Sequence, residues 1–344
     1  MCHRESEDSA PELSIIMPAW NAEPFMGAAI DSVLAQSLED FELVIYVDVS
    51  NDRTVEIARE YERSDRRVRV VESDERGGMC VALNRAISVA RGSLIGRMDA
   101  DDLAAEDRFA RQVALLGSNP EVVVVGSNAL HINREDEVLG LSIAGPVSIE
   151  DFTQRRRRGE ITMVLDGTSV LRRDVFQAAG GYDPELSAAP EVDLHCRMAA
   201  YGAVVAIQDP LLLYRLHPGS SVATQFFEGR SVHRFVEARE QSILSGSTPQ
   251  TYREFVKAES EASTWRRIRI RLDDLGQFHY REAGVHLSEG RKSAAVMSLL
   301  RAFVVSPAFV VRRAWRRRFS PGARQQMSGS LVEGRGQDSP GAKA

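Results

Sequence analysis

Apolar residues along the first third of the chain fall into two alternating patterns. Short runs rich in β-branched residues predict buried strands, and longer stretches with apolar residues three or four apart predict helices. The predicted strands cover residues 13–17, 43–47, 68–71, 94–98 and 122–125. The predicted helices between them cover residues 25–34, 54–63, 80–90 and 105–116. Such alternation is typical of right-handed crossovers and of an α/β fold with a mostly parallel, doubly wound sheet.

The pattern becomes less regular after residue 126. Helices are expected near residues 174–179 and 191–201, with a short strand at 204–207. From about residue 225 the chain is helical and charged, and beyond residue 320 it is poor in large apolar groups, which favours disorder. We therefore expect a flexible N-terminus (1–12), an α/β domain (13–224), a helical region (225–319) and a disordered tail (320–344).

Composition narrows the class of protein. The 344 residues carry a net charge of −6, which gives no overall basic surface for nucleic acid. Three dispersed cysteines form no disulfide or metal framework, and the acidic start of the chain is unlike a secretory signal, so a reducing cytoplasm is expected. The apolar stretch 302–311 is interrupted by Ser306 and Pro307 and is shorter than the roughly 20 residues of a spanning helix. We therefore expect no helix that crosses a membrane.

Ligands of doubly wound sheets bind beyond the carboxyl ends of the strands. Pro18, Trp20 and Asn21 lie where the first predicted strand ends. An aromatic ring there can stack on a nucleobase, or it can simply pack against the following helix. Asp48 follows the second strand and can accept a hydrogen bond from a base or a ribose hydroxyl. Asp52, just before the second helix, is expected to cap that helix.

The fourth predicted strand leads into Asp99, Asp101 and Asp102. Three carboxylates within four residues repel one another unless a cation or hydrogen-bond donors neutralise them. Such an oxygen-rich loop suits Mg²⁺ or Mn²⁺ that also binds substrate phosphates, and a solvated acidic turn is the alternative. His217 can ligate a metal or contact a phosphate, although a lone histidine is more often structural.

A second acidic group lies at the start of the helix predicted over residues 191–201. Glu191 and Asp193 are both placed there. Either carboxylate can serve as a general base that removes a proton from an acceptor hydroxyl. Acidic side chains are also favoured in the first turn of a helix by its dipole, so a structural role stays open for each.

In their order along the chain these segments resemble the family 2 glycosyltransferases. The resemblance covers about residues 13–222 and is carried by Ile15–Asn21, Val47–Asp52, Met98–Asp102, Gly180–Asp183 and Glu191–Leu194. It implies a GT-A fold, a nucleotide-diphospho-sugar donor, Mg²⁺ or Mn²⁺, and inversion at the anomeric carbon as a hydroxyl acceptor attacks. The Q-x-x-R-W motif that accompanies processive synthesis in this family is absent from the sequence, which favours transfer of one sugar.

The resemblance also assigns roles on the donor side. Trp20 takes the place of a tyrosine beside the base, in the same turn as Pro18 and Asn21. Asp48 matches the second aspartate of an Asp-Asp pair and is expected at the nucleobase, whereas Val47 replaces the first aspartate.

The remaining assignments concern the diphosphate and the proton transfer. Asp99 and Asp101 match the D-x-D motif that holds ribose, metal and diphosphate, with Asp102 beside them as a substrate ligand. Glu191 falls where the family has its base aspartate, and Asp193 stays a rival for that role. His217 matches a histidine that contacts the metal or the diphosphate. A non-catalytic nucleotide-sugar-binding or scaffold relative is the main alternative to an enzyme.

The C-terminal third combines arginine with apolar residues. Residues 309–319 place aliphatic and aromatic side chains beside five arginines, which suits the surface of an anionic membrane. A helical hairpin with a solvated basic face is the alternative. A second basic run, residues 155–158, is either a solvated loop or a contact for an anionic acceptor such as a lipid-linked pyrophosphate.

Overall fold

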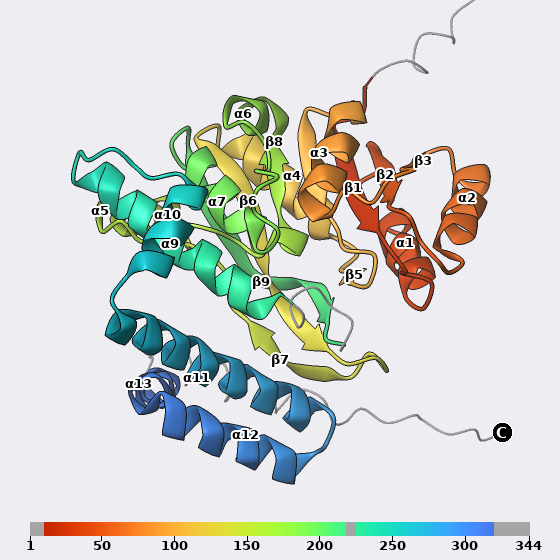
Figure 1. The fold of residues 1–344 in the computed structure, drawn as a ribbon. Coiled ribbons are helices and arrows are strands. Elements are labelled where there is room, and N and C mark those ends of the chain that lie inside the picture. The colour runs from red at the N-terminus through yellow and green to blue at the C-terminus, as the bar shows by residue number, and fades with distance from the viewer. Residues whose placement is uncertain (1–9, 218–224, 320–344) are drawn as a thin grey trace, which may run out of the picture. The chain divides into compact units, whose positions relative to one another are not determined.

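A computed structural model describes residues 10–217 and 225–319, with side chains described up to residue 313 apart from Ser288. The chain divides into two compact units, one up to Glu261 and one from Ala262 (Figure 1). This division falls later than the boundary near residue 225 expected from the sequence pattern. The predicted disordered tail and most of the predicted flexible N-terminus lie outside the described residues.

The first unit is built on one mixed sheet. In the described part of the chain nine strands join in the order β3-β2-β1-β4-β8-β6-β9-β5, with β7 paired to β6. Their bounds are β1 (Leu13–Ala19), β2 (Phe41–Val47), β3 (Val68–Glu72), β4 (Leu94–Arg97), β5 (Leu103–Ala104), β6 (Val122–Ile132), β7 (Val138–Ser142), β8 (Val170–Arg172) and β9 (Ala203–Arg215).

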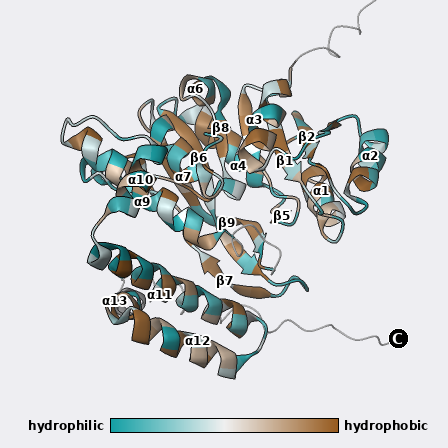
Figure 2. Cartoon of the chain, viewed as in Figure 1, coloured by the Kyte–Doolittle hydropathy of each residue, from teal (hydrophilic) through white to brown (hydrophobic). Residues whose placement is uncertain are grey.

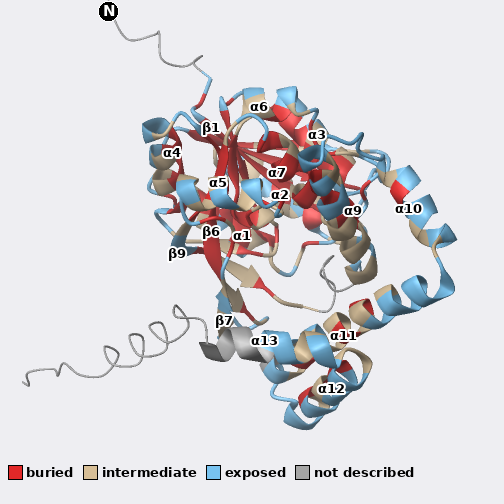
Figure 3. Ribbon diagram, turned by 90° about the vertical axis from the view of Figure 1, so that its left-hand side faces the viewer, coloured by how far each residue is buried: buried red, intermediate tan, exposed pale blue. Residues whose placement is uncertain are grey.

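Helices and one 3-10 turn connect these strands. They are α1 (Met26–Leu34), α2 (Thr54–Ser64), α3 (Met79–Val89), α4 (Arg108–Ser118), α5 (Ile149–Arg157), η1 (Asp166–Thr168), α6 (Arg173–Ala178), α7 (Pro190–Met198), α9 (Phe226–Leu244) and α10 (Tyr252–Glu261). Hydrophobic residues concentrate in the strands, and the strands are the most deeply buried part of this unit (Figures 2 and 3).

The amino-terminal half of the sheet is parallel, as its strand–helix alternation predicted. β1 pairs in parallel with β2 and β4, and β2 pairs in parallel with β3. The chain moves outward from β1 to β3 and then returns past β1 to β4. Right-handed crossovers therefore place α3 on the opposite face from α1 and α2, and they create a switch point between β1 and β4.

The second half of the sheet departs from strict alternation. β8 lies antiparallel between β4 and β6, and β7 is antiparallel to β6, whereas β6 and β9 are parallel. β8 has only three residues, so its sequence carries no usable period. β1 also continues past Pro18 to Ala19, although the sequence pattern ended this strand before the proline. Its pairing with β4 stops at Ile16, so the missing N–H of Pro18 removes no bond on that side.

Buried hydrogen bonds connect the amino-terminal ends of β1 and β2 with the turn before β4. Ser14 Oγ donates a 2.6 Å hydrogen bond to Glu42, and the backbone N–H of Gly92 donates to Ser14 Oγ at 2.8 Å. Glu42 also accepts hydrogen bonds from the backbone and the side chain of Arg91. Burial opposes ionisation of Glu42, but the donors from Ser14 and Arg91 outweigh it and lower the pKa of this carboxyl.

The second unit consists of three helices in its described part, α11 (Thr264–Ser288), α12 (Lys292–Val305) and α13 (Pro307–Phe319). Small residues make the contact between α11 and α12. Ala283 on α11 and Ala295 and Ala302 on α12 are buried. A Cβ added at Gly276 of α11 would clash with Ser306 at the joint between α12 and α13, so only glycine allows this close approach.

Candidate active site

The carboxyl ends of β2, β1 and β4 are adjacent in the sheet. Ala19 at the end of β1 lies opposite Val47 at the end of β2, and Ile16 lies opposite Arg97 on β4. The turn containing Trp20, the residue Asp48 and the acidic loop from Asp99 therefore leave the sheet side by side. This is the edge at which the sequence predicted a ligand site.

The predicted nucleobase residues occupy one side of this edge. Asp48 is buried, and its Oδ1 atom accepts a hydrogen bond from the N–H of Val49 at 3.0 Å. Trp20 is 44% exposed, and the guanidinium of Arg76 stacks 3.9 Å from the centre of its ring. The ring is thus partly exposed, and Arg76 stacks on it. Val47, in the place of the family's first aspartate, is buried in the sheet.

Asn21 and Asp52 fasten the two turns to each other. Asn21 has a positive φ of 48°, and its Oδ1 atom accepts a hydrogen bond from the N–H of Asn51 at 2.9 Å. Asp52 Oδ1 accepts from the N–H of Thr54 at the start of α2, and its Oδ2 atom accepts from the N–H of Glu23. The prediction that Asp52 is the N-cap of this helix is wrong by one residue, because Arg53 occupies that position. Pro18 is half-buried within β1, opposite Tyr46. These contacts position the base-side turns.

The acidic loop forms the centre of the site. Asp99 and Asp101 are partly exposed, whereas Asp102 is buried and its Oδ2 atom has no hydrogen-bond partner among the described residues. Burial raises the pKa of Asp99, and the charges of Asp101 and Asp166 add to this effect. Burial, together with Asp101 and Asp99, raises the pKa of Asp102 well above its usual range. The negative charges of the loop therefore repel one another, and a bound cation would reduce this repulsion.

A buried arginine connects this loop to η1. Arg97 donates to Asp99 Oδ1 at 2.7 Å and, through Nε, to Asp166 Oδ2 at 3.0 Å. The hydroxyl of Tyr182 donates to Asp166 Oδ1 at 2.9 Å. Burial alone would lower the pKa of Arg97, but Asp99 and Asp166 raise it above its ordinary value, so the guanidinium stays charged. Asp99, Arg97, Asp166 and Tyr182 form one chain of polar contacts, which we call the arginine bridge.

β9 supports the acidic loop from the other side. The backbone N–H of Arg215 donates to Asp102 Oδ1 at 2.8 Å, and its side chain donates to the carbonyl of Asp101 at 2.8 Å. His217 Nε2 lies 2.8 Å from Asp101 Oδ2. The ring of Phe25 packs against both the imidazole and the guanidinium, with centres 5.2 Å from His217 and 4.8 Å from Arg215.

These residues fit the divalent cation that the sequence predicted. No group of three His, Cys, Asp or Glu side chains in the described part of the chain forms a ready-made metal cage. Mg²⁺ typically uses one or two carboxylates and takes its other ligands from substrate phosphates and water. Asp101 and His217 offer adjacent ligand atoms. The space beside Asp99 depends on Gly167, because a Cβ added there would lie 3.0 Å from Asp99 Oδ2.

Glu191 lies in the first turn of α7, within electrostatic reach of the arginine bridge. The residue before the helix start, Ala189, adopts a left-handed conformation with φ of 48°. Burial and the negative charge of Asp166 raise the pKa of Glu191 to about 8, and Arg97 opposes this shift. A carboxyl group with such a raised pKa is a candidate for proton transfer.

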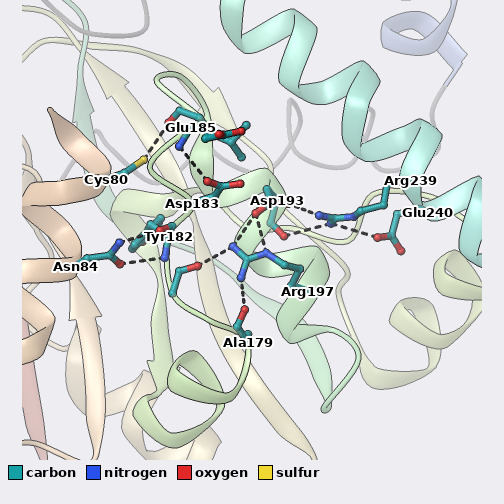
Figure 4. A network of polar contacts seen from close by, with 12 residues as sticks. Cys80, Asn84, Ala179, Tyr182, Asp183, Glu185, Asp193, Arg197, Arg239 and Glu240 are labelled. Carbon is teal, nitrogen blue, oxygen red and sulfur yellow. Dashed lines mark hydrogen bonds and ion pairs between the residues drawn. The ribbon is translucent and has the colours of Figure 1, made fainter. Parts of the chain in front are cut away.

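Asp193, the rival base, has a different environment. It is only 2% exposed, and its two oxygens bind Arg197 on α7 and Arg239 on α9 (Figure 4). Arg239 also contacts Glu240, which in turn binds Arg156 of α5. Asp193 is thus already saturated by two guanidinium groups. The two candidate bases therefore differ in environment: Asp193 is held in two ion pairs, whereas Glu191 has a raised pKa.

Three contributors to the site did not stand out in the sequence. Asp166 lies between predicted elements, and Arg97 and Arg215 lie within or at the end of strands. A signal was present for Arg97, because an arginine inside an otherwise apolar strand requires a buried acidic partner, but the pattern could not name that partner. The basic run at 155–158 is largely neutralised: Arg155 pairs with Asp151 and Arg158 with Glu160.

Known proteins resemble this chain in sequence. Residues 14–180 match the model for glycosyl transferase family 2. The uncharacterized glycosyltransferase EpsJ of Bacillus subtilis (strain 168) is 43% identical over 101 residues, which are 29% of this chain and 29% of EpsJ. The putative teichuronic acid biosynthesis glycosyltransferase TuaG of the same organism is 35% identical over 106 residues, which are 31% of this chain and 42% of TuaG. The matches thus span less than half the length of these two relatives.

Solved structures resemble the fold. S. aureus TarS 1-349 in complex with UDP-GlcNAc aligns with a TM-score of 0.55 and 16% identity, covering 87% of this chain and 91% of that one. The mannosyltransferase PcManGT from Pyrobaculum calidifontis, in complex with GDP-Man and Mn²⁺, aligns with a TM-score of 0.52 and 18% identity, covering 93% and 84%. The expected GT-A fold is confirmed. In sequence, residues 14–180 are thus similar to glycosyl transferase family 2, and the chain has the fold of GT-A glycosyltransferases.

Proposed function

We propose that the first unit transfers one sugar from a nucleotide-diphospho-sugar to an acceptor hydroxyl, with inversion at the anomeric carbon. One observation carries this proposal: Arg97 and Asp166 of the arginine bridge act electrostatically on both the acidic loop and Glu191. A single displacement needs a site that binds the leaving diphosphate and a base that accepts the proton of the acceptor. The acidic loop would supply the first, and Glu191, with its raised pKa, would supply the second. The bound donors of TarS and PcManGT, UDP-GlcNAc and GDP-Man, support this class of substrate.

The nucleoside end of the donor is expected at the turns after β1 and β2. The exposed ring of Trp20 offers a face for the base, and Asp48 offers a buried carboxylate for its edge or for the ribose. Pro18 and Asn21 hold the turn in which Trp20 lies. Asp99 and Asp102 lie next to where the ribose and diphosphate would follow.

Asp101 and His217 would hold Mg²⁺ or Mn²⁺, which when bound supplies positive charge that stabilises the leaving diphosphate. Arg97 keeps Asp99 oriented, and the backbone and side chain of Arg215 keep Asp101 and Asp102 in place. Glu191 receives the proton of the acceptor hydroxyl as that oxygen attacks the face of the sugar opposite the diphosphate. Proton transfer of this kind contributes roughly 10²–10⁴-fold in rate.

The acceptor belongs to the biosynthesis of a cell-surface polysaccharide, glycolipid or other glycoconjugate in this proposal. TuaG, which is named for teichuronic acid biosynthesis, supports the first of these. The absence of Q-x-x-R-W from the sequence favours one hexosyl-type transfer per encounter over polymerisation, and a lipid-linked acceptor fits such stepwise synthesis. The dispersed cysteines favour the cytoplasm, at the inner face of the cell membrane, as the place of reaction.

A nucleotide-sugar-binding relative without turnover is the second candidate, and the buried Val47 in place of an aspartate is the observation that favours it. A thermal-shift panel of UDP-, GDP- and dTDP-sugars with Mn²⁺ identifies the donor, because ligand binding raises apparent stability. Donor turnover, with and without a chelator, then separates enzyme from binder.

Two variants and a control assign the roles. Asp101→Ala and Glu191→Gln should each abolish transfer in folded protein, and Glu191→Gln should keep the donor-induced thermal shift. Glu121→Gln, at an exposed position outside the site, should behave as the unsubstituted protein. Donor binding without turnover in the unsubstituted protein would favour the binder, and full activity of Glu191→Gln would remove the proposed base.

A further inference from the structure

Helix α12 has an inverted pattern of side-chain size. Its buried positions are small residues, Ala295, Ser298 and Ala302. Its large apolar residues are exposed, including Leu300 at 54% and Val304 at 79%. The exposed set lies on one face at helical spacing and consists of Val296, Met297, Leu300, Phe303 and Val304. We call this set the α12 face; its exposed and buried positions can be followed in Figure 3 and its hydropathy in Figure 2.

Polar contacts fix α12 in this orientation. Ser298 Oγ donates to Glu282 on α11 at 2.8 Å, and Glu282 also contacts His279 at 3.1 Å. At the end of α12, Ser306 packs against Gly276 and donates to Asp273 at 3.4 Å. Rotation of α12 to bury its large residues against α11 would break these contacts and would not fit the close approach at Gly276. The α12 face is therefore a stable feature of this unit.

Positive charge surrounds the α12 face. Residues 262–319 contain thirteen Arg and Lys against four Asp and Glu, although the whole chain has a net charge of −6. Lys292 and Arg301 are exposed on α12 itself, and Arg312 and Arg313 are exposed on α13. The start of α11 repeats the combination, since Trp265 is 82% exposed among arginines. Exposed apolar side chains rimmed by guanidinium groups are complementary to a bilayer with anionic headgroups.

The helix lengths decide between lying on a bilayer and crossing it. No single helix in the described residues is long and apolar enough to cross a membrane, while Lys292–Val305 and Pro307–Arg313 pass a composition test only as a pair bent by 118°. The 14 residues of α12 measure roughly 21 Å, which is shorter than the hydrocarbon core of about 30 Å. A bent pair with arginine on its flanks fits the interfacial plane.

We propose that the second unit docks peripherally on anionic membranes through the α12 face, with its arginines contacting lipid phosphates. Flotation of the full chain with vesicles tests this. The chain should float with vesicles of mixed phosphatidylglycerol and phosphatidylcholine, and binding should weaken roughly tenfold on pure phosphatidylcholine or at high salt. The assay contains no donor sugar, so its outcome is independent of the proposed transfer.

A pair of variants locates the contact. Leu300→Ser combined with Val304→Ser should reduce vesicle binding roughly tenfold or more, because two apolar side chains no longer enter the bilayer. The matched control is Val138→Ser combined with Ile143→Ser, two exposed apolar positions in the first unit, and it should bind as the unsubstituted chain. Circular dichroism and thermal melting of both double variants verify that each is folded.

Three results would overturn the proposal. The first is no flotation of the unsubstituted chain at low salt. The second is equal loss of binding in the α12 and control variants. The third is self-association of the unsubstituted chain in solution that disappears in the α12 variant, without vesicle binding, which would assign the face to a second copy of the chain.

Discussion

The Nε atom of Arg97 lies 3.0 Å from Oδ2 of Asp166, and this contact joins the acidic loop after β4 to the turn before β8. Asp166→Asn should lower the rate of sugar transfer by roughly 10–100-fold, the usual effect of removing a residue that orients the direct ligands of a phosphate or metal. The reason is that Arg97 would lose one of its two carboxylate partners and would hold Asp99 less firmly.

Steady-state kinetics with the identified donor measure this effect. Asp174→Asn is the control, because Asp174 is exposed and accepts a hydrogen bond from the N–H of its neighbour Val175. If both Asp166→Asn and Asp174→Asn retained the full rate, the arginine bridge would have no part in positioning the site.

The raised pKa of Glu191 predicts the acidic limb of the pH–rate profile. A base acts only as the carboxylate, so kcat/KM should rise with pH through the pKa of Glu191. That pKa is about 8, raised mainly by burial and by the charge of Asp166, so the rate should rise up to about pH 8. Asp166→Asn removes the neighbouring negative charge and should move the limb to lower pH. If the acidic limb of the profile stayed at the same pH in Asp166→Asn, Glu191 would not be the titrating group.

Asp193 should matter for stability and not for the chemical step. Its carboxylate is buried between Arg197 and Arg239, and removing one partner of a buried ion pair costs about 3–5 kcal/mol. Asp193→Asn should therefore melt at clearly lower temperature while its rate per folded molecule stays near that of the unsubstituted protein.

The matched control for Asp193 is Asp209→Asn, which breaks the exposed pair with Arg111 and should cost about 0–1 kcal/mol. Denaturant unfolding gives both free energies. A stable Asp193→Asn variant without activity would return Asp193 to the position of candidate base.

Glu42 should make the free energy of unfolding dependent on pH in the acidic range. Its folded pKa is lowered, so it contributes stability above its unfolded value near 4.5 and loses that contribution as pH falls through the folded pKa. Glu42→Gln should cost about 1–3 kcal/mol at neutral pH, because buried donors from Ser14 and Arg91 lose a charged acceptor.

The difference between Glu42→Gln and the unsubstituted chain should shrink below pH 4.5 in a series of denaturant melts. Glu39→Gln, at an exposed position, should show no such convergence. A constant difference at all pH values would mean that charge on Glu42 does not stabilise the fold.

The amino-terminal half of the fold could be predicted closely because its strands are short, fully buried apolar runs. β2 and β3 begin and end within two residues of their predicted bounds. The second half could not. β8 is too short to show a period, β7 exposes its apolar Val138, and β9 runs through Pro210 opposite an irregularity at Asn128.

The candidate site follows the same division. Asp48 and the loop from Asp99 could be located because each follows a buried parallel strand, and the topology brings such ends together. Asp166 and Arg215 could not be located, since both reach the loop by antiparallel or distant pairing that local patterns do not encode. The sequence could not separate Glu191 from Asp193, because both lie in the same first turn of α7 and differ only in their tertiary surroundings.

The contacts of Arg215 with Asp101 and Asp102 affect the order in which the site can form as the chain is synthesised. The matching family segment ends at residue 180, but the backbone N–H that anchors Asp102 comes 113 residues after it in the chain. During synthesis the amino-terminal sheet can form early, whereas Asp102 lacks its backbone anchor until β9 emerges and pairs with β6. A fragment ending at residue 180 would therefore keep the contact of Arg97 with Asp99 but lack the support that Arg215 gives to Asp101 and Asp102.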